Sequence, residues 1–527
     1  MRRSKLSLEN SAITSLLVVA VSLASASMVN AQLADSLNFE SASRLGLTPA
    51  WSKAISSGYG GKISGVDIYV SPKSSYQATE VVDKYGRRTF FSDLDIMGRR
   101  QSRSGYDQTL RLTDLKKAEL SARGLDPQSE VKQIPEVTVY VRSTAGTVTA
   151  LDAETGQQKW AVQAGKPGYP SYGVSVNDDH VATLSGANLF LLDAKNGQVL
   201  DNIPLRFLPG GTPTIDGELI YLPTTKGVID VIETSDLGRK KYTLGSSGRI
   251  ESSVTVSPST VSWCTSDGYI YVARAGIPGV IYRFQSLDTM VAAPVYMDAT
   301  LFAASLDGYV YALDEANGDV KWRYAAGGQI REAPIAVEGC IYVTTEDGEM
   351  SAVDAETGNA KWLASGVKRF LSVSNTRVYC MTSGQLLTVL DRTTGNRIGS
   401  VAVGNLGLPI VNTRTDRVYL INQTGVLHCF REFGNRWPIA RIAEVREETE
   451  PGASEATEAA AAANEVAPST PASPSATDQA DIFGEPDAAE PTEAPATDTN
   501  VDDVDVDPFG DLGEEFGGDG KNPFEEF

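Results

Sequence analysis

The chain has 527 residues, enough for two or three domains or for one large β-sheet domain with appended segments. Its net charge of −21 is concentrated in residues 443–527, which contain 24 Asp and Glu residues and only two basic residues, Arg446 and Lys521. The first 442 residues are therefore close to neutral, and we expect no nucleic acid among the partners of this chain.

The N-terminus has the features of an export signal. The basic stretch MRRSK precedes the apolar run AITSLLVVAVSLASASMV, and Val29-Asn30-Ala31 forms a small-residue cleavage pattern before Gln32. The run is too short and too rich in Ser and Ala to make a good membrane anchor, and no Cys near the cleavage site could carry a lipid. We predict a signal peptide over 1–31, a linker over 32–44, and a chain that is soluble after cleavage and either periplasmic or envelope-associated.

A long insertion is predicted between the first two strands of the folded region. These strands are GVDIYVS (65–71) and VTVYVRS (137–143), and the insertion between them covers about 75–133. Long insertions in compact folds are usually functional or disordered. One helix is predicted inside the insertion, with Thr113 as its N-cap, Gly124 as its end, and one face made of Leu115, Ala118 and Ala122.

The insertion also contains a candidate basic patch. KYGRRTFF and MGRRQSR place six cations against only two acids, Asp93 and Asp95. The cations are Lys84, Arg87, Arg88, Arg99, Arg100 and Arg103.

A unit of about forty residues recurs from residue 145 onward. AGTVTALDAETGQQKW (145–160), DGYVYALDEANGDVKW (307–322) and DGEMSAVDAETGNAKW (347–362) are variants of one pattern. Equivalent positions recur eight times, at Asp152, Asp193, Glu233, Arg274, Asp314, Asp354, Asp391 and Arg431. A repeat of this length predicts a propeller or a solenoid.

The local pattern of each unit favours the propeller. In residues 333–365, four short runs alternate apolar and polar residues, and Glu338-Gly339, Asp347-Gly348 and Thr357-Gly358 separate them. In such tight turns, glycine supplies the positive φ that a hairpin requires. Four antiparallel strands per unit make one blade, whereas a helical solenoid would show a period of 3.6. We predict an all-β, eight-bladed propeller over 45–442.

Three units share a small residue, a turn glycine and a tryptophan. We expect the indole on the outer strand to pack across the neighbouring blade, with the alanine leaving room for it. The trios are Ala150, Gly156 and Trp160; Ala312, Gly318 and Trp322; and Ala352, Gly358 and Trp362.

The pattern A-x-D-x-x-T-G-x-x-x-W resembles the tryptophan-docking repeat of the quinoprotein-like (PQQ-type) β-propellers. It is complete at 150–160 and 352–362 and nearly so at 312–322, where Asn317 replaces Thr. The resemblance covers roughly residues 45–440. Within the group, the chain resembles the non-catalytic propeller subunit of the outer-membrane β-barrel assembly machinery. It departs from that subunit in its long insertion, its acidic tail and the missing lipid-carrying Cys.

Closure of the ring has two candidate strands. LGLTPAWSKA (45–54) carries Trp51, and FGNRWPIA (433–440) carries Trp437. In the quinoprotein-like family an N-terminal strand commonly completes the last blade, which removes exposed edges. We predict that Trp51 has this role.

No catalytic, cofactor-binding or metal-binding residue is predicted, and no cofactor is expected. The resemblance implies that the enzymes of the family hold a quinone over a Trp beneath two adjacent half-cystines, with Ca²⁺ bound by Glu, Asn and Asp. This sequence has no adjacent Cys pair, and His180 and His428 are its only histidines. The four cysteines, each within a β-like run, are predicted to be buried and unpaired: Cys264, Cys340, Cys380 and Cys429.

Two surfaces are candidates for binding partners. The segments entering the innermost strands place five charged residues where they could ring one channel opening, although these residues could equally form ordinary surface ion pairs. They are Arg249, Glu251, Arg331, Glu332 and Arg369. The tail is predicted to be disordered and embeds five aromatic residues in acid, as docking tails do, or it serves as a solubilising spacer. They are Phe483, Phe509, Phe516, Phe524 and Phe527.

The sequence therefore predicts an exported, non-enzymatic scaffold, acting as a monomeric propeller that binds other envelope proteins, in envelope or outer-membrane protein assembly. No segment is expected to span the membrane. The alternative is a quinone (PQQ)-dependent dehydrogenase, or a propeller that binds a small ligand or saccharide. A third hypothesis, based on charge complementarity alone, is that the tail folds back on the basic stretch 84–103.

Overall fold

The structure, a computed structural model, describes residues 39–58, 61–93, 104–404, 406–422 and 425–442. They belong to a unit spanning residues 1–448, and residues 449–527 form a second unit. The predicted signal peptide, the tail and most of the linker lie outside the described residues. Residues 39–44, at the end of the predicted linker, form helix α2 (Phe39–Arg44), in which Ala42 is fully buried.

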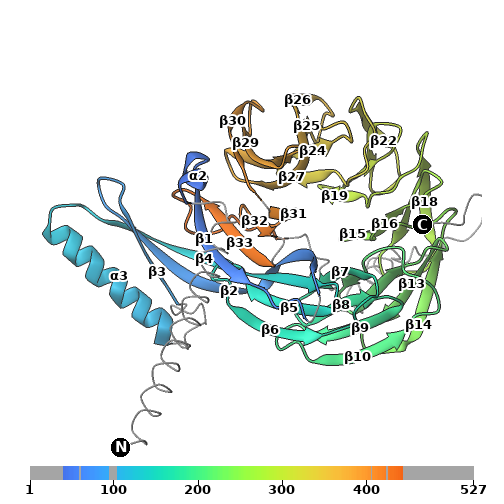
Figure 1. Cartoon of the computed structure of the whole chain (residues 1–527), viewed down its shortest axis with the longest axis horizontal. Helices are drawn as coiled ribbons and strands as arrows, with labels where there is room; N and C mark the ends of the chain where they lie inside the picture. The colour runs from blue at the N-terminus through green and yellow to red at the C-terminus, as the bar shows by residue number, and fades with distance from the viewer. Residues whose placement is uncertain (1–38, 59–60, 94–103, 405, 423–424, 443–527) are drawn as a thin grey trace, which may run out of the picture. The chain divides into compact units, whose positions relative to one another are not determined.

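The described residues form eight antiparallel sheets around a common centre, which confirms the predicted eight-bladed propeller (Figure 1). Blade 1 contains β2 (Ile63–Val82), β4 (Gln128–Ser143), β5 (Thr147–Asp152) and β6 (Gln158–Gln163), with β3 (Arg88–Ser92) added at its edge. Blade 2 contains β7 (Ser171–Val176), β8 (His180–Ser185), β9 (Asn188–Asp193) and β10 (Val199–Pro204), and blade 3 contains β11 (Thr214–Asp216), β12 (Leu219–Pro223), β13 (Val228–Glu233) and β14 (Asp236–Gly245). Blade 4 contains β15 (Thr255–Val256), β16 (Thr260–Cys264), β17 (Tyr269–Arg274) and β18 (Val280–Gln285).

Blades 5 to 8 follow the same meander. Blade 5 contains β19 (Val295–Met297), β20 (Thr300–Ala304), β21 (Tyr309–Asp314) and β22 (Val320–Ala325), and blade 6 contains β23 (Ile335–Val337), β24 (Cys340–Thr344), β25 (Glu349–Asp354) and β26 (Ala360–Ser365). Blade 7 contains β27 (Val367–Val373), β28 (Arg377–Thr382), β29 (Leu386–Asp391) and β30 (Arg397–Ala402). Blade 8 contains β31 (Leu406–Pro409), β32 (Val418–Asn422), β33 (Val426–Glu432) and β1 (Leu47–Ala54). The first strand of each blade lies nearest the centre and the last lies at the periphery (Figure 1).

Blade 6 shows how the sequence produces this unit. Gly339, Gly348 and Gly358 follow one another at its three turns with φ values of +71°, +87° and +72°, a conformation that costs glycine little. In β26 the buried residues alternate with exposed ones, as a half-buried strand requires. The turns predicted from the glycine positions are therefore present.

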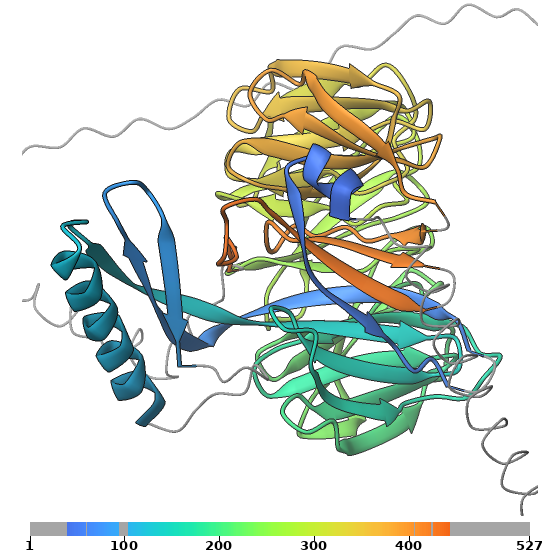
Figure 2. The ribbon, with the colours of Figure 1, turned by 60° about the vertical axis from the view of Figure 1, so that its left-hand side comes forward.

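The ring is closed by strands from the two ends of the folded chain. β1 pairs antiparallel with β33, so that the N-terminal strand becomes the outer strand of blade 8 (Figure 2). Trp51 faces Cys429 across this pairing. Trp437, the other candidate, lies after β33 and outside any strand.

The core lies between adjacent blades and not inside a single sheet. Tyr342 and Trp362 of blade 6, for example, pack with Phe370 and Val378 of blade 7. Because each sheet buries both faces against its neighbours, no blade could keep its apolar surface from water alone. The stability of the ring therefore depends on the contacts between blades.

A buried ion-pair network reinforces the junction between blades 8 and 1. Arg417, before β32, is 1% exposed and donates to Glu154 in the β5–β6 turn, with Nη2–Oε2 at 3.0 Å and Nε–Oε1 at 3.2 Å. Its Nη1 lies 3.3 Å from Asp416, and Nη2 also donates to the carbonyl oxygen of Arg436 at 2.8 Å. Burial opposes the charge of Arg417, but the two carboxylates outweigh it and raise the pKa of this guanidinium.

The insertion predicted over about 75–133 corresponds to an arm, defined here as the described part of residues 75–135. Beyond an irregularity between Val70 and Ser75, β2 and β4 continue as a paired ribbon, to which β3 adds an edge strand. Helix α3 (Ser104–Ala122) covers one face of this sheet (Figure 2). Among the described residues, no helix is long and apolar enough to cross a membrane.

The prediction for this helix was wrong in its start and its buried face. Thr113 lies in the middle of α3, where its hydroxyl donates to the carbonyl oxygen of Thr109 and contacts Thr79 of β2 at 2.5 Å. Leu115, on the face predicted from the apolar pattern, is 67% exposed. The buried face of the helix carries Thr109 and Thr113 beside Leu120, and the two hydroxyl groups donate to the carbonyl oxygens of Ser92 and Thr109. An apolar pattern alone cannot reveal such a face.

The other face of the arm sheet is covered by the segment that follows β33. The indole of Trp437 packs edge-on against Tyr76 of β2 and Phe90 of β3, with centroids 6.2 Å and 5.9 Å away. Arg441 then pairs with Glu338 of blade 6 at 2.8 Å. Residues 434–442 therefore connect the arm to the ring.

Acid is expected to weaken ring closure through His428. This residue of β33 is 4% exposed; its Nδ1 lies 2.7 Å from the Ser52 hydroxyl of β1, and its Nε2 has no partner in the described structure. Burial lowers the pKa of His428 below its usual 6.5. The unfolded chain takes up this proton more readily, so the stabilising contribution is complete above pH 6.5 and is lost as the pH falls below that value.

Urea unfolding near neutral pH and about one to two units lower would test this. His428→Gln is expected to reduce the pH dependence, whereas His180→Gln, at the start of β8, is expected to leave it unchanged. An equal pH dependence in the His428→Gln variant and the unmodified chain would contradict the prediction.

Candidate functional site

The indole of Trp160 crosses from blade 1 to blade 2. Its Nε1 donates to the carbonyl oxygen of Ala194 at 2.9 Å, and its ring lies over Gly197. A Cβ atom at Gly197 would lie 2.5 Å from a ring carbon, and φ there is +75°, so only glycine fits. The ring and the turn together form one docking contact between blades.

Three further indoles make the same contact at other junctions. Trp51 donates to the carbonyl oxygen of Ala153 (2.8 Å), Trp322 to that of Ala355 (3.0 Å) and Trp362 to that of Arg392 (2.8 Å), while their rings lie over Gly156, Gly358 and Gly395. Within a blade, each predicted alanine is fully buried and faces the tryptophan of its own repeat: Ala150 and Trp160, Ala312 and Trp322, Ala352 and Trp362. Each glycine instead receives the aromatic ring of the preceding blade.

The docking turns are held by an aspartate. The carboxylate of Asp354 accepts hydrogen bonds from the backbone N–H and the hydroxyl of Thr357, both at 3.0 Å. The hydrogen bonds from Thr357 and the ion pair with Lys361 lower the pKa of Asp354 to about 2. The Asp and Thr of the repeat thus fix the turn. A carbonyl oxygen of this turn accepts the hydrogen bond from the indole of the preceding blade.

Tyr282 is a docking residue that the tryptophan pattern missed. Its ring covers Gly318 of blade 5, and its hydroxyl donates to the carbonyl oxygens of Asp314 and Glu315, each at 3.0 Å. The signal was present in the sequence, because Tyr282 precedes Trp322 by one repeat length. A smaller aromatic ring with a hydroxyl replaces the indole N–H at this junction.

The propeller has two chemically distinct faces. The turns between first and second strands, the turns between third and fourth strands, and the arm lie on one face, which we call the arm face. The loops that join one blade to the next lie on the other, the loop face, because an antiparallel four-stranded meander places them there.

The five charged residues predicted at one channel opening belong to the loop face, and each takes part in an ion pair. Arg249 pairs with Glu251 of its own loop at 3.2 Å, and Arg331 pairs with Glu346 at 2.8 Å. Glu332 accepts from Arg369 Nε at 2.9 Å, which joins the loop before β23 to β27. The hydrogen bond from Arg331 lowers the pKa of Glu346.

Exposed apolar side chains on the same face were not predicted from the sequence. Tyr169, Leu208 and Leu287 lie in three loops between blades and are 55%, 64% and 82% exposed. Each of them leaves an apolar side chain that a bound partner could cover. Their signal in the sequence is an isolated apolar residue between two blades.

The structure describes only half of the predicted basic patch. Arg87 pairs with Asp83 at 2.7 Å and Arg88 with Glu80 at 2.9 Å, while Lys84 donates to the carbonyl oxygen of Gly124 at 2.7 Å. Two of these three cations are therefore neutralised within the arm. Arg99, Arg100 and Arg103, and the five tail phenylalanines, lie outside the described residues.

The cysteines confirm the prediction of buried, unpaired thiols. Cys264, Cys340, Cys380 and Cys429 lie in four different blades, and burial raises the pKa of each thiol above its usual value. Thiols held neutral in this way are poor nucleophiles. Within the part of the chain that the structure describes, no group of three His, Cys, Asp or Glu residues is placed to hold a metal ion.

Aromatic docking between successive four-stranded blades defines a tryptophan-docking propeller. A model of the family described as outer membrane protein assembly factor BamB (PQQ_2) matches residues 124–215, 144–286 and 266–452, together more than half of the sequence. The chain belongs to this family.

Solved structures resemble parts of the chain. BamB from Moraxella catarrhalis is 17% identical, with a TM-score of 0.48 over 56% of this chain and 91% of its own. The computationally designed Ika8 protein is 14% identical, with a TM-score of 0.46 over 55% of this chain and 92% of its own. No curated protein matches the sequence.

Proposed function

We propose that this chain is an exported, non-enzymatic scaffold that binds protein partners during outer-membrane protein assembly. Membership of the assembly-factor family, over more than half of the chain, is the observation that carries the proposal. The match does not favour the alternatives, a quinone-dependent dehydrogenase or a saccharide-binding propeller. The proposed place of action is the periplasm or the inner side of the outer membrane.

The loop face is the proposed partner-binding surface. Leu208 and Leu287 supply apolar contact area, and the ion pairs Arg331–Glu346 and Glu332–Arg369 supply polar groups at the surface. An interface needs a few buried anchors surrounded by polar contacts that exclude water. We infer that a partner buries the two leucines and aligns itself on the charged pairs.

Deleting the gene in its own host is expected to lower the amount of folded outer-membrane β-barrel proteins. The unmodified chain should restore them, whereas the double variant Leu208→Asp and Leu287→Asp should not, because a charge at each anchor opposes burial. Leu363→Asp is the matched control, since Leu363 is 56% exposed on the outer strand β26 and does not lie in a loop between blades. It should restore assembly fully.

A photoreactive amino acid at position 287 is expected to capture an envelope protein of the assembly machinery, and the same group at 363 is not. Unchanged amounts of folded barrel proteins after deletion would contradict the proposed process. Equal restoration by all variants would contradict the proposed surface.

A further inference from the structure

The sheet of the arm has two edges, one at β3 and one at β4 (Figure 2). At the β3 edge, the carbonyl oxygen of Ser92 accepts from the Thr109 hydroxyl of α3 at 2.9 Å, so the helix satisfies part of that edge. β4 pairs with β5 only from Thr138 onward, and within the described residues no strand pairs with the outer side of 128–135. We call residues 127–135 the β4 edge.

Alternate residues of the β4 edge direct their backbone groups away from β2. The carbonyl oxygen of Val137, just past the edge, accepts from Ala153 on the β5 side at 3.1 Å, and a strand alternates this direction from one residue to the next. The other side of the ribbon agrees, because the carbonyl oxygen of Gln77 accepts from Asp93, just beyond β3, and the next residue of β2 therefore faces β4. Three backbone N–H groups of the edge thus point outward, with no partner in the described structure: Ser129, Val131 and Gln133.

The β4 edge lacks a protection that every outer strand of the ring has. Each of the eight outer strands is irregular in its pairing with the rest of its blade, and bulges of this kind oppose edge-to-edge pairing. The arm ribbon instead pairs regularly over eight consecutive positions, from Ser75 opposite Pro135 to Val82 opposite Gln128. A regular edge with free backbone groups is a template for a further strand.

The two faces of the β4 edge carry different side chains. Val131 lies opposite Thr79, whose hydroxyl contacts α3, so Val131 is on the α3 side of the sheet, where it is 55% exposed. Glu130 and Lys132 lie on the other side, and the Lys132 ammonium is 3.3 Å from Glu130 and 3.1 Å from Glu80. An added strand therefore meets one apolar side chain and one charge of each sign.

The sequence of the β4 edge, PQSEVKQIP, is complementary to itself when two copies run antiparallel. With the two-fold axis at Val131, Glu130 of each copy lies opposite Lys132 of the other, and opposite charges in directly opposed positions stabilise a sheet. The outward backbone groups of the two copies also face each other, as in a hydrogen-bonded antiparallel pair. Pro127 and Pro135, which have no N–H group, then lie opposite each other at both ends, so the pairing leaves no donor unpaired there.

We propose that the β4 edge pairs with the β4 edge of a second copy of this chain, so that the two arm sheets become one antiparallel sheet. The chain is then a dimer with one ring beyond each end of the shared pairing, in place of the monomer expected from the sequence. A strand of another protein could satisfy the backbone groups, but the charge order around Val131 matches a second copy specifically. The loop face takes no part in this contact, so failure of the dimer leaves the proposed function intact.

Val131→Cys tests the pairing on the full mature chain. The two-fold axis places both copies of residue 131 directly opposite, with Cα atoms about 5.5 Å apart, which a disulfide can span. Mild oxidation is therefore expected to link the chains in pairs, and the four native thiols do not compete because they are buried. Leu363→Cys, on the exposed outer strand β26, is the matched control and should not be linked. Equal linking of both variants would show random collision and contradict the pairing.

Sedimentation equilibrium of the chain without added cysteine, over about 1–100 μM, measures the dimer itself. We expect a weak, concentration-dependent dimer, because the paired segment is short. Glu130→Lys and Lys132→Glu should each weaken association about tenfold, since each places like charges opposite one another. An equimolar mixture of these two variants should restore association, because every charge then faces its opposite.

Two substitutions at one position separate the backbone from the side chain. Val131→Pro removes an outward N–H group that the monomer does not use, and should abolish the dimer. Val131→Thr keeps the N–H group and the branched shape, and should retain it. Lys241→Glu, which changes an exposed charge on the outer strand β14, should leave association unchanged. Circular dichroism and proteolysis of the arm verify that each variant folds, and Glu130→Lys alone tests the charges if Lys132→Glu, next to Glu80, does not.

Three results would overturn the proposal: a monomer at every concentration, a dimer that survives Val131→Pro, or, with both variants folded, no association in the mixture of Glu130→Lys and Lys132→Glu. A monomer whose Val131→Cys variant is linked to another envelope protein would also overturn it, and would assign the β4 edge to a strand of that protein.

Discussion

Replacing Arg417 by alanine is expected to lower the free energy of unfolding by about 3–5 kcal/mol. The substitution leaves the carboxylates of Glu154 and Asp416 without their cation at a site where Arg417 is 1% exposed. Burial raises the pKa of Asp416 even with Arg417 present, so removing the guanidinium would favour its protonation further. Urea unfolding followed by circular dichroism measures the loss.

A double-mutant cycle separates the network from general damage to the fold. Arg417→Ala combined with Glu154→Ala should lower the free energy of unfolding by less than the sum of the two single variants. Each single variant leaves the other partner buried without its ion pair, whereas the double variant removes both partners. Arg44→Ala is the matched control, since Arg44 pairs with Glu40 on the surface, where both side chains are more than 70% exposed. That variant should change the stability by at most about 1 kcal/mol. Additive losses would show that the buried network does not act as a unit.

Trp160→Ala is expected to cost about 3–5 kcal/mol, because it removes a buried ring together with the docking hydrogen bond to blade 2. Gly197→Val changes the residue beneath the same ring and should be strongly destabilising. Its Cβ atom would lie 2.5 Å from a carbon of the Trp160 ring, and the positive φ at this position is unfavourable for valine. Both variants are measured by urea unfolding of the exported chain.

Trp437→Ala is the control that removes an indole without removing a docking contact between blades. That ring packs on the arm against Tyr76 and Phe90 and joins no two blades. We expect faster proteolysis of the arm with little change in the unfolding of the ring. If Trp437→Ala destabilised the ring as much as Trp160→Ala, docking between blades could not be the reason for the repeated tryptophan.

The repeat made most of the fold predictable. The forty-residue period set the number of blades, and the turn glycines set the strands within each blade, because both depend on short segments of chain. Tyr282 occupies the docking position of its repeat, but a pattern that requires tryptophan there does not mark it. The helix of the arm was misplaced because its buried residues include Thr109 and Thr113 beside Leu120, and an apolar pattern does not mark the two threonines.

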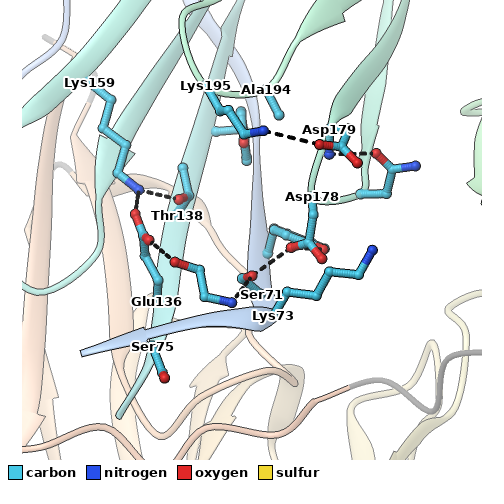
Figure 3. Close-up of a pocket in the computed structure, with 14 residues that line it drawn as sticks. Ser71, Lys73, Ser75, Glu136, Thr138, Lys159, Asp178, Asp179, Ala194 and Lys195 are labelled. Carbon is cyan, nitrogen blue, oxygen red and sulfur yellow. Dashed lines mark hydrogen bonds and ion pairs between the residues drawn. The ribbon is translucent and has the colours of Figure 1, made fainter. Parts of the chain in front are cut away.

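The candidate sites were much less predictable than the fold. The charged residues of the loop face were recognised, but their exposed apolar neighbours Leu208 and Leu287 were not. A pocket at the base of the arm is lined by both Lys73 and Asp178 of blade 2, which lie more than one hundred residues apart in the chain (Figure 3). No local pattern marks such a meeting.

The sequence by itself determined the eight blades, the docking turns and the concentration of charge after residue 442, because each follows from a repeated or local pattern. Only the tertiary structure decided which residues neutralise one another: Arg417 pairs with Glu154 across the junction between blades 8 and 1, and Arg441 pairs with Glu338 of blade 6. The physical reason is that a side chain's charge state and burial depend on neighbours from distant strands, and closing the ring is what makes them neighbours.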